Sequence, residues 1–294
     1  MLRYAQHDNS GSAQRDKVGA LAVCLAGFAV MLLAGDARAT TTDPQLDAGF
    51  RAMYALDFVS SQKSFTEYER AHPADSLGYA AEMAGTFFNE LNRLKLLDQE
   101  FAPGNESFFA KPEGTPDRQV RARIIELGAH ARQMAEARLR LEPGDEPALF
   151  ALALTYGILG DYAALVDRHY WTSVKYGRQG EQYARQLLKR DPEFYDAYIW
   201  LGVSNFIYGS LSFPLRWTAH LFGLSGDKAT GVANLRLAAE KGSYLRPYAE
   251  VLLAIAYLRE KNRPAAATLL AQLSSEFPTN PLFAAQARRV AAAK

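Results

Sequence analysis

Residues 191–209 read DPEFYDAYIWLGVSNFIYG and combine the end of one helix with the start of another. Pro192 cannot continue a preceding helix, because its ring removes a backbone N–H group and clashes with the previous turn. Further on, Leu201 and Gly202 stand side by side. A neighbouring helix can approach closely at the glycine and pack against the leucine. The stretch therefore predicts helices in close contact, joined by a proline-containing turn.

One spacing recurs along the chain and places the same pattern on four further segments. A small or short residue is followed by other residues four and seven positions later, and a proline comes five positions after that. Positions i, i+4 and i+7 lie on one face of a helix, so each segment predicts a helix with one packed stripe that ends at the proline. The four sets are Ser61, Phe65, Tyr68 and Pro73; Ala131, Ala135, Arg138 and Pro143; Gly180, Ala184, Leu187 and Pro192; and Ala266, Leu270, Leu273 and Pro278.

This spacing resembles the second helix and terminal proline of a tetratricopeptide repeat. Leu201 and Gly202 follow Pro192 by nine and ten residues, which is where that family carries its Leu-Gly pair. Leu152 and Ala153 stand in the same places after Pro143. The resemblance implies an all-α, tetratricopeptide-like solenoid of helical hairpins, with about 11 to 13 helices in a chain of this length.

The repeat pattern divides the chain into parts of different regularity. We expect one solenoid domain over residues 40–294, irregular over 40–141, more regular over 142–281, and closed by a capping helix over 282–294. Residues 100–116 lose the helical period and gather proline and glycine, which predicts a long loop. Residues 210–226, SLSFPLRWTAHLFGLSG, form an insertion between the two helices of one repeat.

A second resemblance covers residues 223–257. This segment is similar to a eukaryotic tetratricopeptide family that includes a yeast mitochondrial outer-membrane protein of inclusion clearance and lipid handling. The resemblance implies the same repeat type here. From the residues alone, Gly226 indicates a tight turn, and Asp227 is expected to cap the next helix by accepting from its first amides. The matching residues are Pro214, Gly223, Gly226, Asp227, Lys228, Gly231 and Leu235.

The first 39 residues have the composition of a secretory signal peptide. Arg15 and Lys17 precede an uncharged apolar run over 18–35, which ends in Ala37-Arg38-Ala39. The run is shorter than the roughly 20 residues of a spanning helix, and the small-x-small site follows it. We therefore expect cleavage before Thr40 and a periplasmic protein. The alternative is an uncleaved anchor in the inner membrane.

The residues that carry chemistry do not gather into a recognisable motif. Without the leader, the chain has equal numbers of acidic and basic residues and no basic block, so we expect no nucleic-acid partner. The only cysteine, Cys24, lies in the leader, and the histidines show no zinc-binding spacing. We therefore expect no metal, no cofactor and no catalytic residues.

The first helices of the repeats predict an apolar groove. By the family's groove positions, the resemblance implies a concave lining whose residues are apolar throughout. An exposed apolar surface of that size marks an interaction site or is covered. We expect Phe213, Trp217 and Phe222 of the insertion to form a lid that packs into the groove. The lining residues are Phe150, Leu154, Ile199, Val203, Phe206, Val251 and Ile255.

Three functions are compatible with these features, and one of them is attachment to a membrane interface through residues 213–222. The other two use the groove. The first is a non-enzymatic periplasmic scaffold or adaptor that binds another protein. The alternative is a carrier for an apolar small molecule or lipid, gated by residues 210–224. The sequence identifies neither the partner nor the ligand.

Overall fold

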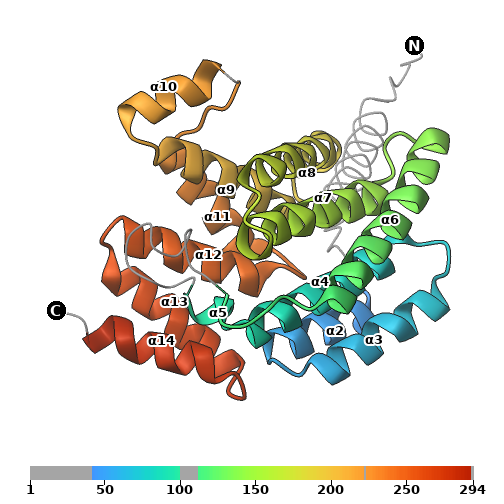
Figure 1. Ribbon diagram of the computed structural model, residues 1–294, viewed down its shortest axis with the longest axis horizontal. Helices are drawn as coiled ribbons and strands as arrows, with labels where there is room; N and C mark the ends of the chain where they lie inside the picture. The colour runs from blue at the N-terminus through green and yellow to red at the C-terminus, as the bar shows by residue number, and fades with distance from the viewer. Residues whose placement is uncertain (1–41, 100–111, 222, 293–294) are drawn as a thin grey trace, which may run out of the picture. The chain divides into compact units, whose positions relative to one another are not determined.

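The computed structural model describes residues 42–99, 112–221 and 223–292, and this part of the chain folds into helices joined by turns, without a β-strand (Figure 1). The all-α prediction is confirmed for these residues. The α-helices are α2 (Pro44–Tyr54), α3 (Phe58–Ala71), α4 (Ser76–Arg93), α5 (Leu96–Gln99), α6 (Arg118–Leu141), α7 (Glu146–Asp161), α8 (Tyr170–Arg190), α9 (Tyr198–Gly209), α10 (Phe213–Leu221), α11 (Lys228–Lys241), α12 (Arg246–Arg259), α13 (Arg263–Glu276) and α14 (Pro281–Ala292). A π-helix, η2 (Tyr162–Val166), extends α7, and a 3-10 turn, η3 (Tyr195–Ala197), precedes α9.

Three sequence predictions fall outside the described residues. These are the signal peptide over 1–39, most of the loop over 100–116, and Phe222 of the expected lid.

Residues 42–294 form a compact unit by themselves.

The four prolines that were predicted to end helices lie in turns of the same geometry. In each turn the residue before the proline donates its N–H to the carbonyl four residues earlier, and its own carbonyl accepts the N–H of the residue three positions later. The prolines have no N–H to donate, which suits them to the position where the ladder stops. The closing bonds run from His72 to Tyr68, Glu142 to Arg138, Asp191 to Leu187 and Phe277 to Leu273, at 2.8, 2.9, 2.8 and 2.8 Å; the following bonds run from Asp75 to His72, Asp145 to Glu142, Phe194 to Asp191 and Asn280 to Phe277, at 2.9, 3.1, 3.2 and 3.0 Å.

The stripe predicted from the recurring spacing is the buried face of these helices. In α3, α8 and α13 the three predicted positions are the buried ones, and in α6 the two alanines of the stripe are buried among others. Most side chains on the other faces of these helices are partly or fully exposed. The predicted stripe is therefore confirmed in α3, α8 and α13, whereas Arg138, the third predicted position in α6, is exposed and pairs with Glu142 and Asp145.

Most helices pack against their neighbours in the chain. The strongest contacts join α2 with α3, α3 with α4, α4 with α6, α7 with α8, α9 with α11, α11 with α12, α12 with α13, and α13 with α14. Alternate helices also touch, since α4 contacts both α2 and α7, and α12 contacts α9. Within the described residues one helical stretch, Glu146–Val166, has the length and apolarity to cross a membrane, and 72% of it is buried inside the fold. Such burial is typical of a core helix.

The insertion of α10 does not separate α9 from α11, because glycines bring these two helices into direct contact. A Cβ atom on Gly202 would lie 2.7 Å from Cγ of Leu235, and one on Gly231 would lie 2.5 Å from the backbone nitrogen of Phe206. Such distances are far below van der Waals contact. Only residues without a side chain fit at this crossing, which is how the opening stretch of sequence shapes the fold.

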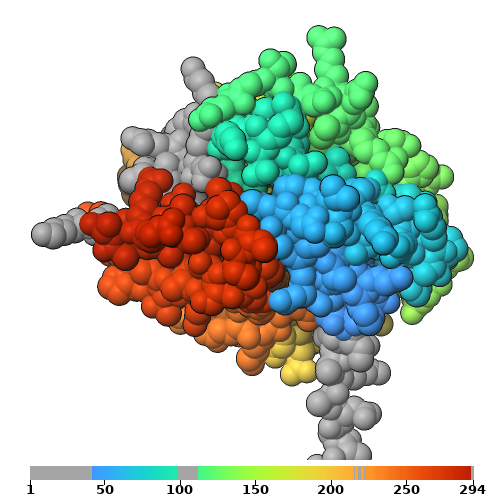
Figure 2. All heavy atoms as spheres, turned by 90° about the horizontal axis from the view of Figure 1, so that it is seen from below, coloured from blue at the N-terminus to red at the C-terminus, as the bar shows by residue number. Residues whose placement is uncertain are grey.

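The first described helix meets the last ones. The Asp43 amide donates to the hydroxyl of Tyr244 at 2.6 Å, and the Tyr54 hydroxyl donates to the carbonyl of Tyr244 at 3.1 Å. The Asn280 side-chain amide donates to the Tyr54 carbonyl at 2.8 Å. Figure 2 shows the surfaces of the N-terminal helices, in blue, and the C-terminal helices, in red, side by side. The sequence pattern gave no indication of this contact.

Candidate functional site

The side chains predicted to line an apolar groove are inside the fold. Five of them are buried, and Val203 and Val251 are partly buried. The ring of Phe150, for example, packs against Phe194 and Trp200, with centroid distances of 4.9 and 6.3 Å. The prediction of an open apolar groove at these positions is therefore wrong, because neighbouring helices and aromatic rings already cover them. The buried residues are Phe150, Leu154, Ile199, Phe206 and Ile255.

The predicted lid forms a helix, but Phe213 and Trp217, its two residues that the structure describes, are not packed into the core. Phe213 and Trp217 lie on α10 and are 81% and 63% exposed. The expectation that Trp217 packs into a groove is wrong, and the reason is the same: the first helices are already packed, so no apolar surface is left for a lid to fill.

The predicted turn and cap residues lie at the start of α11. Asp227 accepts from the amide and the hydroxyl of Thr230, both at 2.8 Å. These hydrogen bonds lower the pKa of the Asp227 carboxyl. A Cβ atom on Gly226 would lie 2.6 Å from the carbonyl oxygen of Asn205, so this turn sits directly against α9. Both residues have structural roles.

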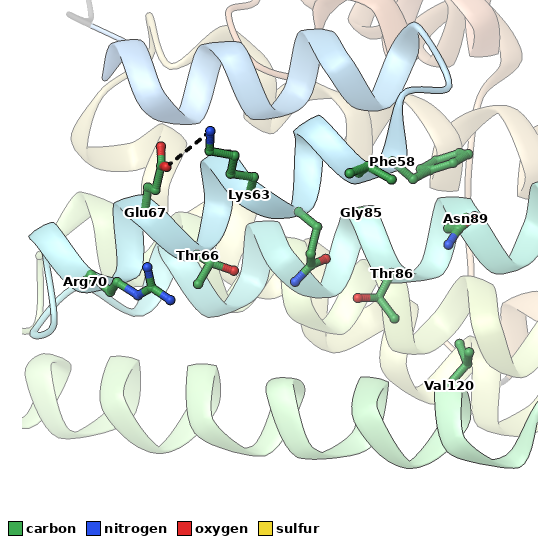
Figure 3. Close-up of a pocket in the computed structure, with 11 residues that line it drawn as sticks. Phe58, Lys63, Thr66, Glu67, Arg70, Gly85, Thr86, Asn89 and Val120 are labelled. Atoms are coloured by element: carbon green, nitrogen blue, oxygen red, sulfur yellow. Dashed lines mark ion pairs between the residues drawn. The ribbon is translucent and has the colours of Figure 1, made fainter.

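An open groove of about 600 Å³ lies on a different face, formed by α3, α4 and α6 (Figure 3). Its wall is a continuous face of α3, because Val59, Gln62, Lys63, Thr66, Glu67 and Arg70 follow each other at helical spacing. Helix α4 supplies the other side chains, and Val120 of α6 lies near one end. The remaining lining residues are Phe58, Gly85, Thr86 and Asn89.

Gly85 lets α3 come close to α4 along this groove. A Cβ atom at this position would lie 3.2 Å from the ring of Phe65 and 3.3 Å from the hydroxyl oxygen of Ser61, two residues of the buried stripe of α3. Gly85 itself is buried, whereas Thr86 is partly exposed and Asn89 is exposed. The groove therefore has a backbone floor with polar side chains beside it.

The lining changes character along its length. Phe58, Val59 and Val120 make one end apolar, and Val59 is 84% exposed. The opposite end carries the charged residues Lys63, Glu67 and Arg70, and the first two form an ion pair of 3.9 Å (Figure 3). Amide and hydroxyl groups of Gln62, Thr66, Thr86 and Asn89 lie between or beside them. Side chains of these types can donate to and accept from the backbone of a bound chain.

Sequence reasoning missed this groove. Its polar residues look like the solvated face of an ordinary amphipathic helix, and the pattern does not reveal which helices flank that face. One signal was present: Val59 interrupts a polar face with an apolar side chain.

A cluster of acidic and basic side chains joins the same three helices next to the groove. Glu69 follows Thr66 on α3, and Glu82 precedes Gly85 on α4. Arg123 of α6 donates to Oε1 of the buried Glu82 from Nε at 3.1 Å and from Nη2 at 2.6 Å. Burial, together with a hydrogen bond to Glu82 and the negative charge of Glu82, raises the pKa of Glu69 to about 8, although Arg123 opposes the shift. Protonation of Glu69 is therefore favoured near neutral pH.

The raised pKa of Glu69 makes stability depend on pH. Because the folded pKa of Glu69 lies above its ordinary value of 4.5, the folded state binds the proton more tightly than the unfolded state does. The contribution of Glu69 is fully present below about pH 4.5 and is lost as the pH rises through about 8. We expect the free energy of unfolding, measured by urea denaturation, to fall between about pH 5 and pH 9. Glu69→Gln should reduce this slope above about pH 7, because the amide stays neutral; below that pH the slope persists, because burial also raises the pKa of Asp161 to about 7 and that of Asp196 to about 6.

The matched control is Glu67→Gln on the same helix. Its partner Lys63 is exposed, so this change should leave the slope as it is in the unmodified chain. A slope above about pH 7 that Glu69→Gln leaves unchanged would contradict this role of Glu69.

Metal binding and relatedness to known proteins add no further site. Among the described residues, no three His, Cys, Asp or Glu side chains gather where they could hold a metal ion. The chain matches no protein-family model and no curated protein.

Proposed function

We propose that this chain is a non-enzymatic helical-repeat scaffold, exported to the periplasm, which binds a segment of another protein in the groove of α3, α4 and α6. The observation that carries the proposal is the open groove itself, with an exposed apolar end and a polar wall. Export is proposed from the apolar run and the small-x-small site in the first 39 residues.

The dimensions of the groove suit a short stretch of polypeptide. Its wall runs from Val59 to Arg70, which corresponds to about 16 Å along a helix at 1.5 Å per residue. An extended peptide of about five residues or three turns of helix spans that length. The apolar end offers an anchor for one large side chain, and the amides and hydroxyls beside it offer partners for a peptide backbone.

We also propose that the helix pairs form a tetratricopeptide-like solenoid. The four matching proline turns and the buried stripe at one spacing support it. So do the contacts between consecutive and alternate helices. In such an array each pair packs mainly on its neighbours, so the surfaces that are not used for this packing remain available for binding.

The alternative of an apolar-ligand carrier is less well supported. It needs an open apolar groove on the first helices, and five of the seven residues that would line it are buried in the core. The groove on α3, α4 and α6 has charged and polar lining, which suits a protein segment better than a lipid chain.

The apolar end of the groove gives a direct test. Val59→Asp places a charge where a partner side chain would be buried, and we expect it to weaken partner binding by about tenfold or more, equivalent to about 1.4 kcal/mol. Because Val59 is 84% exposed, the variant should fold normally. The measurement is quantitative recovery of co-purifying proteins from a native extract, followed by affinity measurement with the purified partner.

Leu141→Asp is the matched control. Leu141 is 83% exposed at the end of α6 and does not line the groove. The same charge introduced there should leave binding unchanged. Equal losses in both variants, or no loss in either, would contradict the proposal.

A further inference from the structure

Helix α10 presents an exposed apolar stripe that the proposed groove does not use. Phe213, Trp217 and Leu221 stand at positions i, i+4 and i+8, so they share one face of the helix. They are 81%, 63% and 65% exposed. Single exposed apolar residues are common on proteins, but three in register on one short helix are not scattered at random.

Turns join α10 to α9 before it and to α11 after it. Before the helix, the Ser210 amide donates to the carbonyls of Phe206 and Ile207 at 3.0 and 3.1 Å. After it, the turn at Gly226 and Asp227 packs against α9. Of the described helices, α9 is the one that α10 contacts most, and it does so only lightly. The stripe is therefore next to α9 and stands away from the core.

The charged side chains of the segment that carries the stripe have one sign, and the acidic Asp227 follows directly after it. Between Ala197 and Gly226 the sequence contains no acidic residue, and its ionisable side chains of basic type are Arg216 and His220, both on α10. Lys228 follows at the start of α11, where its ammonium group pairs with Glu260 at 2.7 Å. A stripe of aromatic and aliphatic residues with adjacent basic residues is complementary to a bilayer that exposes anionic headgroups.

The size of the stripe favours a bilayer over a second protein. Three side chains of these types at these exposures offer roughly 400 Å² of apolar surface. A stable protein interface buries about 800 Å² on each partner. An interfacial helix needs no matching partner surface, and tryptophan is enriched at the level of the headgroups. We propose that α10 inserts its Phe213, Trp217 and Leu221 face into the interfacial region of an anionic membrane, so that the scaffold works at a lipid surface.

Tryptophan fluorescence of the full chain tests this insertion. The protein has three tryptophans, Trp171, Trp200 and Trp217. We mix it with vesicles of phosphatidylcholine and phosphatidylglycerol that contain a brominated lipid, which quenches only tryptophans at the bilayer. We expect a blue shift and quenching of the emission, both lost in Trp217→Phe and reduced when phosphatidylglycerol is omitted.

Trp171→Phe is the matched control, because Trp171 is 77% exposed on α8 and lies outside the stripe. This variant should retain the quenching. Attachment through the apolar run over 18–35 alone would bring the protein to the vesicle but leave the Trp217 signal unchanged, which would overturn the proposal. Equally, a dimer in solution that Phe213→Ser/Trp217→Ser/Leu221→Ser disperses, without quenching in the unmodified chain, would overturn it.

Discussion

Replacing Gly231 by alanine should lower the free energy of unfolding by about 3 kcal/mol or more. The added methyl group would lie 2.5 Å from the backbone nitrogen of Phe206, 2.8 Å from its Cα and 2.9 Å from the carbonyl oxygen of Gly202. All three are backbone atoms, so no side chain can rotate away, and α9 must separate from α11. For a domain of this size we expect the melting temperature to fall by about 6 to 12 °C in a thermal scan.

Gly177→Ala provides the opposite result in a matched control. Gly177 lies within α8, is exposed, and has open space where its Cβ would be. Alanine has a higher helix propensity than glycine, so this variant should be more stable by up to about 1 kcal/mol. If both substitutions had the same effect, the close packing of α9 on α11 would not be what holds this part of the fold.

Asp196→Ala should be the second strongly destabilising change, at about 3 to 5 kcal/mol. The buried carboxylate accepts the amides of Ser243, Tyr244 and Leu245 at 2.8, 3.1 and 3.2 Å. Burial raises the pKa of Asp196 to about 6 although these three amides oppose the shift, so the group is ionised at pH 7.5. Alanine leaves three donors without an acceptor. Urea denaturation at pH 7.5 measures the loss.

Asp196→Asn is the control with the smaller expected loss of stability. It keeps the oxygen that accepts from Ser243 and Leu245 and loses the acceptor of the Tyr244 amide, so we expect a smaller loss of about 1 to 2 kcal/mol. Because Tyr244 also bonds with Asp43 and Tyr54, hydrogen exchange in Asp196→Ala should speed up at both 243–246 and 43–54. Protection that stays unchanged at 43–54 would contradict this link between the first and last helices.

The sequence predicted those features that depend on neighbours within a few turns. Helix α6, for example, ends at Leu141, just before the predicted Pro143. The proline turns and buried stripes followed from spacing, because helix termination and burial of one face are local properties.

Features set by distant contacts were not predictable in the same way. Tyr244 and Asp43 are 201 positions apart, and Asn280 and Tyr54 are 226 apart, so no local pattern connects them. That packing also explains the two errors. Once the first helices are covered by their neighbours, Phe150 and Ile199 become core residues and Trp217 has no groove to enter. The groove on α3 was not predictable, because residues such as Gln62 and Lys63 are equally typical of a solvated helix face.

Photo-crosslinking tests directly whether the groove of α3, α4 and α6 binds a segment of another protein. A photoreactive amino acid is placed at Gln62 of α3, at Thr86 of α4, or at the exposed Thr268 of α13 as a control, each in the full chain. Crosslinked peptides are then identified by mass spectrometry. We expect Gln62 and Thr86 to capture the same short segment of one protein, and we expect Thr268 not to capture it. Capture of that segment from Thr268, or of unrelated segments from Gln62 and Thr86, would contradict it.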